Sequence, residues 1–137
     1  MTFHEAIKKA LQHLELAERF LAEGNELIDK DSVQASEKLY KATEEAVKTI
    51  AIALKPPEAD EAAKRGRWTT GLLESAVVNI MRRLELDELY HWWGSAYRLC
   101  VDSFHEARFR SIDVILRLRD VEAVVNLAKK VLKMCSA

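Results

Sequence analysis

Glycine and proline are scarce in this sequence, which has four Gly and two Pro in 137 residues. A β-rich fold needs many turns, and these two residues mark turns, so their scarcity favours long uninterrupted helices. No apolar run reaches the 18 residues that a membrane-spanning helix needs, and we expect no membrane partner. The first residues carry acidic side chains and lack the apolar centre of a signal peptide, so we expect a cytoplasmic protein.

Cysteine and the common cofactor motifs are equally rare. Cys100 and Cys135 stand apart, without a CxxC spacing, which predicts two reduced, buried thiols. The absence of a glycine-rich phosphate loop excludes Rossmann and P-loop chemistry. Glu88 and His91 form a single ExxH, whereas a di-iron bundle needs two such pairs and two more glutamates. We therefore expect no metal and no cofactor.

Apolar residues recur instead at the three- and four-residue steps of amphipathic helices. The first predicted helix begins at a capping box formed by Thr2 and Glu5 and ends near Gly24, which tolerates a left-handed cap. Its expected buried stripe consists of Phe3, Ile7, Ala10, Leu11, Leu14, Ala17 and Leu21.

The same pattern predicts the rest of the chain. We expect helices from Asp31 or Ser32 to about Leu54, from Thr69 or Thr70 through GLLESAVVNIMRRLE, from about Asp87 to Ala107, and from an N-cap at Asp120 to about Met134. Pro56 and Pro57 end the second helix, and residues 55–67 are predicted to form a charged connection that could hold a helical turn. The stretch RFRSIDVILRL is predicted to form a turn followed by a short helix. These elements predict an all-α, antiparallel up-and-down bundle of about five helices, in one domain over residues 1–137.

Charge is divided unevenly between the two halves of the chain. Residues 1–62 hold eight Lys/Arg against 13 Asp/Glu, whereas residues 63–137 hold 13 against nine and contain nine of the ten arginines. A basic half can present a surface to phosphate or nucleic acid. It can equally pack beside the acidic helices, within one chain or between subunits, and the overall pI of about 6.4 is not basic.

The stretch YRLCVDSFHEAR, residues 97–108, contains Arg98 and His105. Seven residues of α-helix fall roughly 20° short of two turns, so both side chains would face the same way. Arg98 could hold a phosphate bidentately and His105 could move a proton near neutral pH. A chance shared face, with a His hydrogen-bonded inside the bundle, is the common alternative. The cluster that follows could extend a phosphate-binding surface, or serve solubility alone: Arg108, Arg110, Arg117 and Arg119.

Several separated blocks of this sequence occur together in a known family. They are SVQASEKLYKATEEAVKTIA, Trp68 leading into LLESAV, SFHEARFRSIDV and RDVEAVVNLAKK, and they span about residues 5–130. In this order they resemble the archaeal PaREP-type paralogous family, which is related to the HEPN (higher eukaryote and prokaryote nucleotide-binding) domains. The resemblance implies a HEPN-like helical bundle that commonly dimerises.

The resemblance also implies a chemistry for the stretch around Arg98. HEPN ribonucleases carry an Arg, four to six intervening residues and a His, and two copies meet in a dimer to form a metal-independent RNA-cleaving site. Arg98 and His105, with six residues between them, fit that pattern at its upper limit. The implied roles are His105 as acid/base at the ribose 2′-OH and the leaving oxygen, and Arg98 as the residue that stabilises the phosphate charge. Leu99 departs from the pattern, because active members often have a polar residue there.

Three hypotheses follow. The first is a nucleotide- or RNA-binding homodimer, with metal-independent endoribonuclease activity of toxin type as its catalytic form. Its catalytic residues would be Arg98 and His105, and its binding residues Tyr97, Glu106, Arg108 and Arg110. The second is a non-catalytic helical dimer that serves as a protein-interaction module, for a partner such as a nucleotidyltransferase. The third is a small-ligand pocket among Trp92, Trp93 and Tyr97, although such aromatic residues more often form core.

Overall fold

The chain folds into helices that pack side by side. The computed structural model describes residues 2–105 and 109–136, apart from the side chains of residues 104 and 105. Its elements are α1 (Phe3–Leu27), α2 (Ser32–Leu54), α3 (Pro57–Arg65), α4 (Thr70–Leu84), α5 (Glu88–Arg98), the π-helix η1 (Leu99–His105) and α6 (Ser111–Ser136). No strand occurs in the ranges described, so the predicted all-α helical bundle is confirmed, with six α-helices rather than about five.

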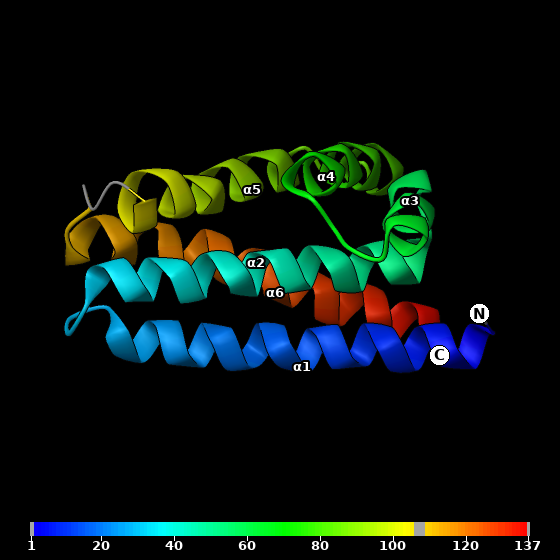
Figure 1. Ribbon diagram of the computed structural model, residues 1–137, viewed down its shortest axis with the longest axis horizontal. Helices are drawn as coiled ribbons and strands as arrows, with labels where there is room; N and C mark the ends of the chain where they lie inside the picture. Colours follow the sequence, from blue (N-terminus) through cyan, green and yellow to red (C-terminus); the bar gives the residue numbers. More distant parts are fainter. Residues whose placement is uncertain (1, 106–108, 137) are drawn as a thin grey trace.

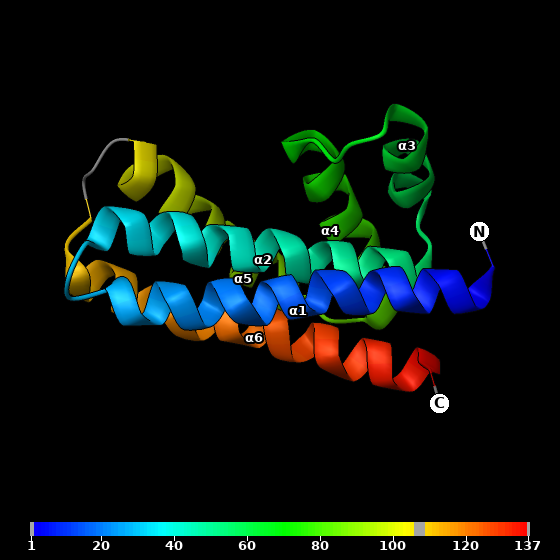
Figure 2. The ribbon, with the colours of Figure 1, turned by 60° about the horizontal axis from the view of Figure 1, so that its bottom comes forward.

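Helix α2 is the centre of this bundle, because it contacts every other element. Helices α1 and α6 run along it, α4 and α5 cover its other side, and α3 stands across one end (Figure 1). Figure 2 shows α3 and α4 near one end of α2 and the π-helix near the other. Within the ranges described, no helix is long and apolar enough to cross a membrane.

Helix α1 packs on α2 mainly through small residues, and part of the predicted stripe, Ala10, Leu14 and Ala17, is buried. Its buried positions are Ala6, Ala10, Leu14, Ala17 and Gly24, whereas Phe3 and Leu11 are exposed. A Cβ atom on Gly24 would lie 2.8 Å from the side chain of Leu39, so a larger residue there would force the buried Leu39 side chain to shift. The predicted end of this helix at Gly24 is wrong, because α1 continues to Leu27.

Three helices, α1, α2 and α4, begin where the capping residues predict them. Thr2 and Glu5 form the capping box of α1, the Asp31 carboxylate accepts from Gln34 N at 3.1 Å, and the Thr69 hydroxyl accepts from Leu72 N at 3.2 Å. The charged connection, by contrast, contains a full helix, α3. Pro57 occupies its first turn, where a missing N–H costs nothing, and Gly66 ends it in the left-handed conformation.

The last third of the chain departs most from prediction. The helix expected from Asp87 to Ala107 keeps α-helical geometry only to Arg98 and continues as the π-helix. Asp120 is not an N-cap but lies inside α6, which begins nine residues earlier at Ser111. Contacts distant in sequence hold that start, since the Ser111 hydroxyl donates to the carbonyl oxygen of Ile28 at 3.1 Å and the Ser32 hydroxyl to that of Phe109 at 3.2 Å.

Candidate functional site

The predicted site begins where α5 becomes the π-helix. Arg98 is the last residue of α5, and Leu99 to His105 follow in the wider π geometry. A π turn holds more residues than the 3.6 of an α-helix, so seven residues no longer complete two turns and the same-face argument for Arg98 and His105 does not hold. The side chain of His105 lies outside the described residues. Short π segments inside helices are frequent at functional sites.

Arg98 and Arg117 both lie over the ring of Phe109, and these three residues are named here the arginine–phenylalanine cluster. The guanidinium carbon of Arg98 lies 5.9 Å from the ring centroid, and that of Arg117 lies 5.1 Å from it. Arg117 reaches back from α6 and donates to both the carbonyl oxygen and the hydroxyl of Ser95 in α5, at 3.2 and 3.1 Å. Nε of Arg98 donates to Asp102 at 2.7 Å. The cluster therefore joins α5, the π-helix and α6.

The electrostatics of this cluster make Arg117 an unusual arginine. Burial lowers the pKa of Arg117, and the nearby positive charge of Arg98 lowers it further. The carboxylates of Asp102, Asp120 and Asp113 act in the opposite direction. Beside Arg117 lies a cavity of about 270 Å³, lined also by Ser95 and Phe109. Of the residues described, Arg117 is the one cation in the lining, with Asp113 and Asp120 as its carboxylates, while Arg98 makes the other contact with the Phe109 ring. An anion near both guanidinium groups would reduce their repulsion but would also meet these carboxylates.

The other predicted binding residues divide into three cases. Arg110 is 82% exposed, and its Nε lies 3.5 Å from the carboxylate of Asp113. That carboxylate also accepts from the backbone N–H of Arg110 at 2.9 Å, and this hydrogen bond is the main reason that the pKa of Asp113 is lowered. Glu106 and Arg108 lie outside the described residues. Tyr97, the third case, belongs to a different surface of α5.

Tyr97 packs in an aromatic group with Tyr40 and Trp93, not with Arg98. The ring of Tyr97 lies 6.0 Å from that of Tyr40 and 6.3 Å from that of Trp93, centroid to centroid. Trp93 and Tyr97 line a cavity of about 380 Å³, to which Trp92 does not contribute. Among the residues described, the indole N–H of Trp93 is the one buried side-chain donor without an acceptor. These contacts place Tyr97 mainly in the core between α2 and α5.

Acidic and histidine side chains do not gather into a metal site anywhere in the described part of the chain. Glu88 and His91 are both exposed at the start of α5. Cys100 and Cys135 are free and half-buried, and burial raises the pKa of the Cys100 thiol.

Sequence reasoning missed Phe109, Ser95 and Asp102 as parts of the site. Phe109 lies in a segment read as a turn, and Ser95 and Asp102 carry no motif. Arg117 was grouped with the other C-terminal arginines, with no signal that its side chain reaches back to Ser95 in α5. The i,i+4 spacing of Arg98 and Asp102 is the one pattern that could have indicated their ion pair.

Comparison with known proteins agrees with this fold. A crystal structure of a protein from Sulfolobus solfataricus has 36% identity and a TM-score of 0.76, and the match covers 85% of this chain and 95% of that one. A solution structure of the same structural-genomics target has 34% identity and a TM-score of 0.74, covering 85% and 91%. No curated protein matches. The sequence model of the archaeal PaREP1/PaREP8 family matches residues 12–125, and the chain belongs to that family.

Proposed function

We propose that this protein binds single-stranded RNA through the arginine–phenylalanine cluster, with the RNA phosphates as the groups recognised. The observation that carries the proposal is the pair of guanidinium groups held on one half-buried ring beside a cavity. A guanidinium has five N–H donors. Arg98 gives its Nε donor to Asp102 and Arg117 gives Nη1 to Ser95, which leaves other donors on both residues for phosphate oxygens.

Exposure favours Arg98 as the first contact with such a ligand. Its side chain is 58% exposed, although it is already ion-paired. Arg117 is more buried and fixed by Ser95, so it would hold a phosphate that enters the cavity. Asp102 pairs with Arg98, and Asp113 and Asp120 line the cavity beside Arg117, so carboxylates compete with a phosphate for both cations. The expected affinity is therefore moderate and falls steeply with salt.

Cleavage of the bound RNA is the catalytic form of this proposal, and it rests on the HEPN-like resemblance. His105 would take the proton of the ribose 2′-OH, whose oxygen attacks the adjacent phosphorus. The P–O5′ bond breaks, the protonated His105 of the same or the second copy returns a proton to the 5′-oxygen, and the products are a 2′,3′-cyclic phosphate and a 5′-OH. Arg98 would stabilise the extra negative charge on the phosphate oxygens in the transition state.

Binding is tested with labelled single-stranded RNA by fluorescence anisotropy at several salt concentrations. Loss of one phosphate contact in Arg98→Ala or Arg117→Ala should reduce the slope of log K against log salt by about 0.7 for a single strand. Arg82→Ala is the matched control, because Arg82 is exposed at the far end of α4. Identical curves for all three variants and the wild type would refute the phosphate contact.

Cleavage is tested on the same RNA in the presence of EDTA. Wild-type protein should release a 5′-OH fragment, and His105→Ala should not. RNA that stays intact with wild-type protein, while Arg98→Ala still weakens binding, would keep the binding proposal and reject the catalytic one.

A second candidate function, a protein-interaction module, is favoured by an apolar row on α6. Ile112, Ile115 and Leu116 lie at the i, i+3 and i+4 positions of one helix face and are all exposed. Leu116 also lines the cavity beside Arg117. A second copy bound on this row would bring two arginine–phenylalanine clusters together, and sedimentation at several concentrations tests for that dimer.

A further inference from the structure

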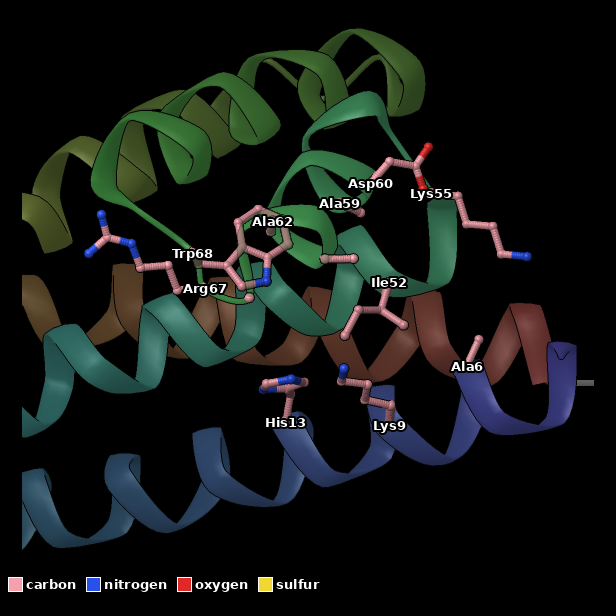
Figure 3. A pocket seen from close by; sticks show the side chains of 12 residues that line it. Ala6, Lys9, His13, Ile52, Lys55, Ala59, Asp60, Ala62, Arg67 and Trp68 are labelled. Atoms are coloured by element: carbon pink, nitrogen blue, oxygen red, sulfur yellow. The ribbon is translucent and has the colours of Figure 1, made fainter. Parts of the chain in front are cut away.

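Another cavity lies far along the bundle from the arginine–phenylalanine cluster (Figure 2). It has a volume of about 510 Å³ and lies between α1, α2, α3 and the loop after α3 (Figure 3). Small-molecule sites typically measure about 300–1,000 Å³. None of the residues that line it belongs to the cluster or to the aromatic group around Tyr97.

The surface of this cavity is apolar in its middle. Ile52 of α2, four alanines and the half-buried indole of Trp68 make up that part. Figure 3 shows Trp68 on the side of α3, across from the side chains that rise from α1. A flat aromatic side chain beside small residues leaves room for a second planar ring, and aromatic contacts add about 0.5–1.5 kcal/mol beyond the buried area.

Positive charge surrounds this apolar middle. Lys9 reaches from α1 into the space below Trp68, whereas Lys55 and Arg67 lie at its edges, with Asp60 as the one acidic residue in the lining. In the described ranges, none of these three cations forms an ion pair with a protein carboxylate. Lys9 and Lys55 belong to the acidic half of the sequence, residues 1–62, and Arg67 follows that half closely. The cavity therefore favours an anionic ligand.

His13 adds an oriented hydrogen-bonding group. Its Nδ1 lies 2.5 Å from Oε2 of Glu45, and the other carboxylate oxygen of Glu45 lies 3.2 Å from the ammonium of Lys48. Burial alone would raise the pKa of Glu45, but the hydrogen bond with His13 and the charge of Lys48 outweigh it and lower that pKa. Because Nδ1 is occupied by an ionised carboxylate, Nε2 is the ring nitrogen that remains for a ligand in the cavity that His13 lines.

We propose that this cavity binds a small aromatic anion: a planar ring that carries a phosphate or a carboxylate group. The ring lies against Trp68 and Ile52, and the anionic group pairs with Lys9 beside the ring of His13. Lys55 and Arg67, both exposed, attract the ligand from the two edges. This site is independent of RNA binding at the arginine–phenylalanine cluster.

Calorimetric titration of the full chain tests this proposal with four probes. Phenyl phosphate and indole-3-acetate carry both features and differ in the anionic group, whereas inorganic phosphate and indole each carry one. We expect at least one of the first two to bind more than tenfold more tightly than either single-feature probe. The tighter-binding of the two shows whether the site prefers a phosphate or a carboxylate. The proposal would be overturned if neither phenyl phosphate nor indole-3-acetate bound. It would also be overturned if inorganic phosphate bound as tightly as the better of the two.

Variants locate the site. Lys9→Met keeps the apolar stem and removes the charge, and it should weaken binding of the preferred probe about tenfold or more. Lys8→Met is the matched control, since Lys8 is exposed on the same helix but does not line the cavity. The indole N–H resonance of Trp68, assigned with Trp68→Phe, should shift on titration. Equal affinities for the two lysine variants, or an unshifted Trp68 resonance, would show that the probe does not bind in this cavity.

Discussion

Ser36 in α2 and Ser103 in the π-helix share a buried hydrogen bond, with 2.6 Å between their hydroxyl oxygens. Ser36 also bonds the carbonyl oxygen of Ser32 at 2.8 Å, one turn earlier in α2. The π-helix is thus fixed against the central helix at the segment that follows Arg98. The position of the arginine–phenylalanine cluster depends on this contact as well as on α5.

Replacing Ser36 with alanine should lower the free energy of unfolding more than replacing Ser103. Ser36→Ala leaves the Ser103 hydroxyl buried with no partner in the described part of the chain, and should lower the free energy of unfolding by about 1–3 kcal/mol. Ser103→Ala leaves Ser36 bonded to Ser32 and should cost only about 1 kcal/mol. Urea unfolding measures both, and the double variant should cost less than the sum of the single ones. Strictly additive costs would show that the hydrogen bond does not couple them.

Two helical glycines should respond in opposite ways to alanine. At Gly24 the new methyl group would lie 2.8 Å from the buried Leu39 side chain, so overpacking of about 1–3 kcal/mol outweighs the helix propensity gained. At Gly94 nothing lies within 4 Å, and Gly94→Ala should stabilise the protein by about 0.5–1 kcal/mol. Thermal unfolding compares the two. A stabilising Gly24→Ala would mean that α1 and α2 are less tightly packed than in this structure.

The elements that sequence predicts correctly are those with local causes. The N-terminal caps at Thr2, Asp31 and Thr69 each depend on residues within three positions, and apolar periodicity gives the helices between them. The buried face of α1 is different. Periodicity predicts Ala10, Leu14 and Ala17 there, but it also predicts Phe3 and Leu11, which are exposed. It misses Gly24, which is buried because α2 approaches closely at Leu39.

The predictions of the start of α6 and of the candidate site fail for a related reason. Ser111 is held by the carbonyl of Ile28, 83 residues away in sequence, and no local pattern contains that contact. The contact of Arg98 with the Phe109 ring is a tertiary one, and the π geometry of Leu99–His105 has no recognisable sequence signal. Residue type predicted that Arg98 was of interest. Arg117 was predicted only as one of four arginines that could extend the surface, and its contact with Phe109 comes from tertiary structure alone.

Stability should fall at acidic pH in part through Glu58. This buried carboxylate in α3 accepts hydrogen bonds from Ser75 at 2.5 Å and from Asn79 at 2.8 and 2.9 Å, and so joins α3 to α4. Burial by itself would raise the pKa of Glu58, but these hydrogen bonds lower it overall. A carboxyl whose pKa is lower when folded stabilises the protein above its unfolded pKa, and this stability is lost as pH falls through the folded value.

Glu58→Gln should remove this pH-dependent contribution to the free energy of unfolding. At pH 7 it should cost about 1–2 kcal/mol, because hydrogen bonds to a charged acceptor become neutral ones, and the difference from wild type should shrink below pH 4. Glu61→Gln is the control, since Glu61 lies on the same helix and pairs with Arg65 near the surface. Urea midpoints at pH 7 and pH 3.5 measure the effect. A difference between Glu58→Gln and wild type that does not change with pH would contradict the role of the ionised carboxylate.

Leu116 should control self-association if the apolar row on α6 is the dimer surface. Its side chain is 59% exposed, between Ile115 and the cavity that contains Arg117. Leu116→Glu would place a charge in the middle of that surface, where desolvation opposes burial, so we expect a monomer at concentrations at which wild-type protein sediments as a dimer. Leu11→Glu, at an exposed leucine of α1, should leave the dimer intact. RNA affinity should also fall in Leu116→Glu if two clusters bind one strand, and an unchanged affinity would assign RNA binding to the monomer.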